Sequence, residues 1–412
     1  MPTQNANLNT TWTINTSDDT WTLAEGATIT TDNADGVFAD DAYTGNTVNL
    51  LGDVVVSGLA SGVSLEGSYN ELHIGVHSDI DATAGNIGVR IAGQQTSVDN
   101  DGAIRGFLSG IEAFTETEIV NSGLVTGGFA VHSGYDDLKI DNSGKMIGTL
   151  DSGVEVEGDY AEIVNRADGL IKGPTAVEFH GKSDILTNFG KIIGTNAAIM
   201  DGDGEARIIN RGVIKGDVDL GAGNDRFDTR GGTATGTIDG GDGADIYLVS
   251  SNTVKISEEA DHGGDTVKST VDYKLGANIE NLTLLGKKDI DGAGNGASNV
   301  IYGNKGDNAL RGLGGDDSII SGHGNDLMLG GKGEDVFAFA KKTGHDVIGD
   351  FQDGHDLILS DFVKGESDFD DMMANHVKVK GDDLLIHYGD DTLLIKDMHK
   401  SDLDMSDFFI GL

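Results

Sequence analysis

Acidic and amide side chains recur every nine residues in the C-terminal half of the chain. Asn299, Asn308, Asp317, Asp326 and Asp335 keep this spacing without a slip. Each stands at the end of a glycine-dense turn, and glycine lets the carbonyls of a tight turn point toward an ion. Calcium takes about six to eight oxygen ligands from carboxylates and carbonyls. The spacing therefore predicts a series of calcium sites, each completed by the neighbouring coil on the same side.

A large apolar residue follows each of these positions by two residues, as Ile319 follows Asp317. Alternation of period two indicates a short strand with one buried face. One turn and one strand make a nonapeptide, and two nonapeptides complete a coil of about 18 residues. We therefore expect residues 294–338 to form a parallel β-roll. Its predicted core positions are Ile301, Leu310, Ile319, Met328 and Phe337.

Two further turns of the same kind precede the array, one ending at Asp225 and the other at Asp245. We assign residues 220–250 to a short first roll and residues 251–293 to a connecting β segment. Across both rolls, the residues predicted to take part in calcium binding are Gly221, Gly223, Asp225, Gly241, Gly243, Asp245, Asn299, Gly303, Gly306, Asn308, Gly312, Gly314, Asp317, Gly322, Gly324, Asp326, Gly331, Gly333 and Asp335.

A longer repeat occupies the N-terminal half. Glycine pairs four residues apart, beginning with Gly102 and Gly106, recur at intervals of 21 to 25 residues, each followed by an apolar residue and preceded by an asparagine. About three alternating strands in about 22 residues describe one coil of a parallel β-helix, and stacked coils would align the asparagines into an internal or corner ladder. These asparagines are Asn100, Asn121, Asn142, Asn165, Asn188 and Asn210.

The two repeats define the expected fold class. We predict an all-β protein in which a right-handed parallel β-helix of about 22 residues per coil continues into a calcium-binding parallel β-roll with a C-terminal cap. The β-helix is assigned to residues 51–219. Residues 1–50, with Trp12 and Trp21, are assigned to an N-terminal cap that shields the open edge of the first coil.

Composition limits the classes of partner. The formal net charge is −41, and the first basic residue is Arg90, so nucleic acid should be repelled. Because no basic residue precedes Arg90, the chain lacks the basic start of a Sec signal peptide. No stretch approaches the roughly 18 apolar residues of a membrane span. There is no cysteine. An extracellular protein without disulfides needs another means of stabilisation, and the surplus of carboxylates favours a bound hard cation in that role.

Motif searches remove several classes of enzyme. The 11 histidines include no His-Glu-x-x-His, no Gly-x-Ser-x-Gly is present, and the chain has no thiol. One set of residues keeps an enzymatic interpretation open, because stacked coils would place it at equivalent outward strand positions, with His180 and Asp201 nearby. It consists of Glu112, His132, Glu155 and Glu178.

These outward residues have two interpretations. Coils lie about 4.8 Å apart, so crowded carboxylates could acquire a raised pKa and supply a general acid or base for a polysaccharide. The alternative is a solvated polar face of the β-helix. We favour the second, because a glycan-processing groove usually carries aromatic platforms and basic residues, and aromatics make up only 6% of this chain.

The array at 294–338 resembles the RTX hemolysin-type calcium-binding repeats, a family exported whole by type I secretion. Residues 265–283 and 344–351 are similar to segments that flank the repeats in that family. The resemblance implies that Asp346 and Asp350 cap the roll and can ligate a last calcium. The closing residues 402–412 are like an uncleaved type I secretion signal, so residues 339–412 are assigned to a C-terminal cap and signal.

The chain departs from the family pattern in the first two turns of the array. Asn299 and Asn308 stand where the family has aspartate, and Ala297 replaces a turn glycine. We expect these turns to bind calcium weakly or to contribute carbonyls only.

The resemblance implies an extracellular or cell-surface protein of a Gram-negative bacterium that binds several calcium ions and folds on them outside the cell. Its expected partners are the type I secretion apparatus and either further copies of the chain or anionic cell-surface polysaccharide. We favour a non-catalytic role, as an adhesin or as an S-layer-like or biofilm-matrix subunit. The alternative is a secreted polysaccharide lyase, hydrolase or epimerase that uses the β-helix face.

Overall fold

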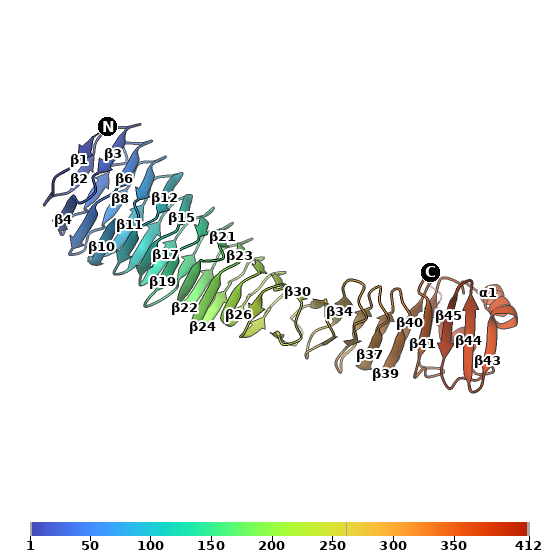
Figure 1. The fold of residues 1–412 in the computed structure, drawn as a ribbon. Coiled ribbons are helices and arrows are strands. Elements are labelled where there is room, and N and C mark those ends of the chain that lie inside the picture. Colours follow the sequence, from blue (N-terminus) through green and yellow to red (C-terminus); the bar gives the residue numbers. More distant parts are fainter. Residues whose placement is uncertain (1, 261, 410–412) are drawn as a thin grey trace. The chain divides into compact units, whose positions relative to one another are not determined.

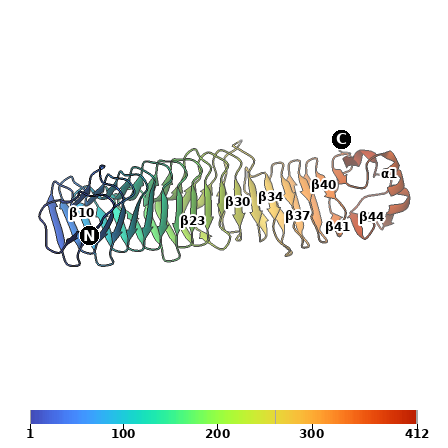
Figure 2. The same cartoon turned by 90° about the horizontal axis from the view of Figure 1, so that it is seen from above.

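The structure is a computed structural model that describes residues 2–260 and 262–409, and its regular secondary structure is almost entirely short β-strands. The chain divides into two compact units, Met1–Asp242 and Gly243–Leu412. Within each unit, strands of successive coils pair in parallel, and each is a β-solenoid (Figures 1 and 2). The predicted fold class is confirmed. No helix in these described ranges is both long enough and apolar enough to cross a membrane.

Three strands make up each regular coil of the first unit, as the repeat predicts. Every strand of one coil pairs in parallel with its equivalent in the next. One such coil contains β12 (Thr96–Asn100), β13 (Ala103–Gly106) and β14 (Ser109–Ala113), and the next contains β15 (Thr117–Asn121), β16 (Leu124–Gly127) and β17 (Phe129–Ser133).

The apolar positions of the long repeat form the core of this unit. Ile104 lies in register with Val125, and Val125 with Met146, and all three side chains are fully buried. Because equal positions of successive coils lie one above another, the burial of one apolar residue per coil extends into a continuous core.

The repeated asparagines form a hydrogen-bonded asparagine ladder (Asn100, Asn121, Asn142, Asn165, Asn188 and Asn210) inside the coils. Nδ2 of Asn121 donates to Oδ1 of Asn142 at 2.7 Å, and Nδ2 of Asn142 donates to Oδ1 of Asn165 at 2.8 Å. All six side chains are buried. An amide both donates and accepts, so a stack of amides satisfies its members in turn. The predicted ladder is confirmed.

Regular coils begin before residue 51. Strand β3 (Thr20–Leu23) already pairs in parallel with β6 (Thr47–Leu50), and β2 (Trp12–Ile14) pairs with β5 (Val37–Ala39). The rings of Trp12 and Trp21 meet edge to face at 5.7 Å. The residues assigned to a cap therefore contain stacked coils of their own, whose longer repeats of 24 to 27 residues hide the period.

The second unit has shorter coils with two strands each. Ile301, Ile319 and Phe337 stack in register on one side, and Leu310 stacks on Met328 on the other. All five are fully buried, as predicted. The segment assigned as a connection belongs to the same stack, because β32 (Thr266–Ser269) pairs with β34 (Asn281–Leu284), and β34 pairs with β36 (Val300–Tyr302).

The parallel stacking of the second unit ends in an antiparallel sheet. Strand β41 (His345–Ile348) pairs in parallel with β45 (Asp391–Ile395), to which β44 (Asp383–Tyr388) and then β43 (Val377–Lys380) add in antiparallel fashion. The added strands cover the edge of the parallel stack at β41, and an edge of that kind would otherwise invite pairing with another chain. Residues 410–412 of the expected secretion signal lie outside the described residues.

Candidate functional site

The aspartates of the array tie successive coils together through the backbone. Oδ1 of Asp317 accepts a hydrogen bond from the N–H of Asn299 at 2.8 Å, and Oδ1 of Asp335 accepts one from the N–H of Asp317 at 2.9 Å. On the other strand of the coil, Oδ1 of Asp326 accepts from the N–H of Asn308 at 2.7 Å. Each acceptor follows its donor by 18 residues, so one carboxylate oxygen sets the stacking of one coil on the next.

The second oxygen of each carboxylate is left without a partner. Oδ2 of Asp317, Asp326 and Asp335 is buried and accepts no hydrogen bond from any described residue. An unpaired buried carboxylate oxygen is costly. Burial raises the pKa of Asp317 and of Asp326 to about 7, and that of Asp335 to about 6, against the backbone hydrogen bonds that lower it.

Two glycines leave room beside these oxygens. A Cβ on Gly312 would lie 2.0 Å from Oδ2 of Asp317, and a Cβ on Gly330 would lie 2.1 Å from Oδ2 of Asp335. These two oxygens thus pack against glycines where any other residue would clash with the carboxylate. Orphaned buried carboxylate oxygens fit calcium, which would complete their coordination and hold the carboxylates ionised.

The turn backbones adopt the conformation that calls for glycine. In the turn before Asp326, Gly322 and Gly324 have φ of 96° and 132°, in the left-handed region where a side chain is strained. Left-handed φ recurs at the equivalent predicted glycines Gly221, Gly223, Gly241, Gly243, Gly331 and Gly333.

The turn before Asp317 places the left-handed conformation at other residues than the two glycines named from the sequence, whose part in calcium binding stays a prediction. Its left-handed residues are Leu313, with φ of 84°, and Gly315, with φ of 91°, rather than Gly312 and Gly314. Gly315 precedes its aspartate by two residues, the spacing that left-handed glycines keep in the other turns. Because Gly312, Gly314 and Gly315 lie so close together, the sequence did not show which of them is left-handed. Leu313 occupies a position that is glycine in those other turns.

In the two turns that end at Asn299 and Asn308, the side-chain amide finds hydrogen-bond partners within the protein. Nδ2 of Asn308 donates to the carbonyl of Ile290 at 2.6 Å and to Oδ1 of Asn304 at 3.1 Å. Nδ2 of Asn299 donates to the carbonyl of Ile279 at 3.0 Å. A neutral amide takes the place of the unpaired oxygen, and neither Gly303 nor Gly306 is left-handed. This geometry is consistent with weak calcium binding in these turns.

The linkage between aspartates continues into the C-terminal cap. Oδ1 of Asp346 accepts from the N–H of Asp326 at 3.0 Å, and Oδ1 of Asp356 accepts from the N–H of Asp335 at 3.0 Å. Asp350 accepts from the N–H groups of Gly330 and Gly331. Asp356 was missed in the sequence, although buried Ile358 follows it at the repeat's spacing.

Carboxylates ahead of the array make similar contacts. In the first unit, Oδ1 of Asp225 accepts from the N–H of Ala206 at 2.6 Å. Oδ1 of Asp184, which the sequence did not single out, accepts from the N–H of Ala161 at 2.7 Å. Oδ2 of Asp184 is buried without a hydrogen-bond partner in the described chain, and burial raises the pKa of this residue to about 7.

In the second unit, Asp245 belongs to a group of three buried carboxylates. Its N–H donates to Oδ1 of Asp265 at 2.9 Å, and oxygens of Asp245, Glu258 and Asp265 lie within 4.8 Å of one another. The hydroxyl of Tyr247 donates to Oε1 of Glu258. Glu258 has no counterpart in the nonapeptide pattern, so only the fold brings it to Asp245. Oxygen-only sets of this kind suit a hard cation.

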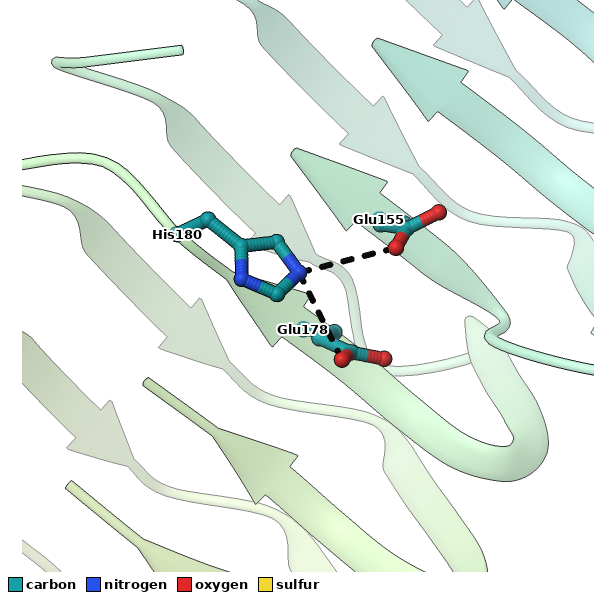
Figure 3. A group of neighbouring side chains, drawn as sticks. All are labelled: Glu155, Glu178 and His180. Atoms are coloured by element: carbon teal, nitrogen blue, oxygen red, sulfur yellow. Dashed lines mark ion pairs between the residues drawn. The ribbon is translucent and has the colours of Figure 1, made fainter. Parts of the chain in front are cut away.

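The outward residues of the first unit meet as predicted. Glu112, His132, Glu155 and Glu178 occupy one register position in successive coils, which Met200 continues. His180, which directly follows β22 (Leu170–Phe179), approaches two of them (Figure 3). We call Glu112, His132, Glu155, Glu178 and His180 the Glu–His cluster. Asp201 is not part of it, because it lies one residue beyond the register position.

Ion pairs connect the members of the Glu–His cluster. Nε2 of His180 lies 3.5 Å from Oε1 of Glu155 and 3.4 Å from Oε1 of Glu178. Nε2 of His132 lies 3.7 Å from Oε2 of Glu155. The facing carboxylate of Glu112, aided by the neighbouring glutamates, raises the pKa of His132. Burial raises the pKa of Glu155, although His132 opposes the shift.

Comparisons with known proteins agree with the array's geometry. Residues 302–337 match the family model of the RTX calcium-binding nonapeptide repeat, in four copies. The resemblance predicted from the sequence is thereby confirmed. The chain thus carries RTX calcium-binding nonapeptide repeats within the β-solenoid of its second unit.

Two individual proteins were also found to be similar. The Endo-1,3-1,4-beta-glycanase EglC of Rhizobium meliloti (strain 1021) is 45% identical over 159 residues, which are 39% of this chain. The aligned part spans only 31% of that glycanase. Among solved structures, the extracellular lipase LipA from Serratia marcescens aligns with 56% of this chain and 45% of its own, at 17% identity and a TM-score of 0.26.

Proposed function

We propose that this protein is a secreted structural or adhesive solenoid whose second unit folds when it meets calcium outside the cell. The observation that carries the proposal is the unpaired, buried Oδ2 of Asp317, Asp326 and Asp335. Without an ion, these carboxylates must be buried either unpaired or protonated, and both states weaken the fold near neutral pH.

Bound calcium would instead make the buried carboxylates stabilise the fold. The ligands of each proposed site come from successive coils and are brought together only on folding, so binding free energy contributes to the free energy of folding. At an ion concentration 100-fold above Kd, each site contributes about 2.7 kcal/mol. A few such sites suffice to decide whether a small unit folds, since whole domains are stable by only about 5–15 kcal/mol.

The way in which the first unit uses its residues supports a structural or adhesive role. Its repeated apolar and asparagine positions serve packing and coil registry. We propose export by the type I apparatus and display at the surface of a Gram-negative cell or in its biofilm matrix. Calcium would there bridge copies of the chain, or bridge the chain to anionic polysaccharide.

A second candidate function is modification of a polysaccharide. The Glu–His cluster favours it, because Glu155 carries a raised pKa and stands between two imidazoles. Glu112, His132, Glu155 and Glu178 would then be the catalytic set. The partial similarity to a protein named as an endo-glycanase adds support from a different direction.

The deciding experiment is a calcium titration of the full chain from chelated conditions, followed by circular dichroism, light scattering and electron microscopy. We expect β-structure to increase with calcium and ordered assemblies to appear at millimolar ion. An unchanged spectrum in chelator would contradict calcium-dependent folding. A protein that folds with calcium, stays monomeric and cleaves a β-glucan or an anionic polysaccharide would favour the second candidate.

A further inference from the structure

We propose that Glu155, Glu178 and His180 form a binding site for a transition-metal ion, Zn²⁺, on the first unit. The site is separate from the proposed calcium array and is not part of the nonapeptide pattern. Glu155 lies in β20 (Val154–Val156) and Glu178 in β22, which pair in register, and His180 follows two residues after Glu178. Figure 3 shows the three side chains turned toward one another.

The imidazole nitrogen lies from both carboxylates at the separations that a tetrahedral ion requires. Nε2 of His180 is 3.5 Å from Oε1 of Glu155 and 3.4 Å from Oε1 of Glu178. One ligand atom from each of the three residues lies within 4.8 Å of the other two. Zinc bonds of about 2.0–2.1 Å in a tetrahedron place neighbouring ligands about 3.4 Å apart. An ion can therefore enter between these atoms with little movement of the side chains.

The two carboxylates are already oriented for this role. Oε2 of Glu178 accepts a hydrogen bond at 2.6 Å from the hydroxyl of Ser152, which is fully buried. Oε2 of Glu155 faces Nε2 of His132 at 3.7 Å. In each glutamate one oxygen is engaged elsewhere and the other points at the same imidazole nitrogen. Such outer contacts orient metal ligands in known sites, and their loss typically weakens metal binding about 10–100-fold.

His73 shows what a histidine between carboxylates looks like when it cannot form such a site. Its Nδ1 lies 3.3 Å from Asp99 and its Nε2 lies 3.8 Å from Glu71. The two carboxylates meet different nitrogens of the ring, so no single ion can bind the imidazole and both carboxylates. Around His180 both carboxylates converge on Nε2, so a single ion could bind the imidazole and both carboxylates.

The ligand set selects the ion. An imidazole nitrogen with two carboxylates suits Zn²⁺ and its neighbours in the first transition row, whereas calcium prefers oxygen alone. Three protein ligands leave the fourth position of a tetrahedron open to water. His180 is about half exposed, with 46% of its side chain accessible, so the ion has a route from solvent.

The test is isothermal titration of the calcium-saturated full chain with zinc chloride, repeated with Co²⁺ to detect tetrahedral coordination by its visible absorption. Saturating calcium keeps the oxygen-only sites filled. We expect the wild-type chain to bind one Zn²⁺ that His180→Ala weakens more than tenfold. Glu178→Gln should do the same, and Ser152→Ala should weaken binding by a smaller factor.

His73→Ala is the matched control, because it also removes a half-exposed histidine that lies between two carboxylates. It should leave zinc binding unchanged. Circular dichroism of each variant in calcium establishes that it is folded, and the exposed position of His180 makes its replacement tolerable. The proposal fails if the folded wild type binds no zinc. It fails equally if His180→Ala binds zinc as tightly as the wild type, since the ion would then lie elsewhere.

Discussion

Oδ1 of Asp335 accepts a hydrogen bond from the backbone N–H of Asp317 at 2.9 Å, although the two residues are 18 positions apart. The same carboxylate keeps Oδ2 buried and unpaired. One oxygen therefore holds two coils in register, and the other is available to bind a cation. An asparagine at this position could therefore reproduce the hydrogen bond of the aspartate, but not its charge.

Asp335→Asn should change stability in opposite directions with and without calcium. The amide keeps an acceptor for the Asp317 N–H, so in chelator the variant should be at least as stable as the wild type. In calcium one site is lost, which removes about 2.7 kcal/mol at an ion concentration 100-fold above Kd. Thermal unfolding in chelator and in calcium measures both effects.

Glu334→Gln is the control for this substitution, since it removes the same charge from the neighbouring exposed position. It should leave the calcium-dependent gain in stability intact. If Asp335→Asn gains as much from calcium as the wild type, Asp335 does not ligate the ion.

Gly330→Ala should weaken calcium binding without any change in charge. The new methyl group would lie 2.1 Å from Oδ2 of Asp335 and would displace the carboxylate that we propose as a calcium ligand. Gly296→Ala is a matched control in the same array, because a Cβ there meets nothing within 4 Å. Calcium titration of both variants should show a higher folding midpoint for Gly330→Ala alone, and equal midpoints would place the ion elsewhere.

The stability of the calcium-free protein should fall as the pH rises. The pKa of Asp317 and of Asp326 is raised to about 7 in the folded state, chiefly by burial, whereas unfolded aspartate titrates near about 4. A raised folded pKa favours the protonated form, so the stabilisation is complete below about pH 4 and is lost as the pH rises through about 7.

Denaturant unfolding in chelator at pH 5 and pH 8 measures this loss. Calcium should abolish it, because the ion binds the ionised form. The double variant Asp317→Asn, Asp326→Asn should show a smaller pH effect than the wild type in chelator. What remains is expected from Asp335, whose pKa burial raises to about 6, and from Asp184 and Asp201 in the first unit, whose pKa values burial raises to about 7. An identical pH effect in wild type and double variant would contradict the assignment.

Asn142→Ala should destabilise the first unit whether or not calcium is present. It leaves Nδ2 of Asn121 and Oδ1 of Asn165 buried without their partner, at a cost of about 3 kcal/mol. Lys145→Ala, an exposed change in the next strand, should have little effect. Unfolding monitored in chelator and in calcium should give the same loss for Asn142→Ala, and a loss that calcium removes would link the ladder to the ion instead.

The sequence by itself determined the repeating parts of the fold. Nine-residue spacing predicted that Ile319 and Phe337 stack in one core, and the longer repeat predicted the asparagine ladder. Both predictions succeeded for one reason, since coils of equal length bring equal positions into register. The coils within residues 1–50 escaped notice because their longer and less regular repeats break that equality.

Only the tertiary structure decided which atoms meet. The left-handed conformation of Leu313 and the approach of Glu258 to Asp245 have no signal in the nonapeptide pattern. Strand register predicted that Glu155 and Glu178 are neighbours, but not that one oxygen of each turns to Nε2 of His180. That convergence depends on side-chain rotation and on contacts such as the Ser152 hydrogen bond, which packing between coils sets and residue spacing does not encode.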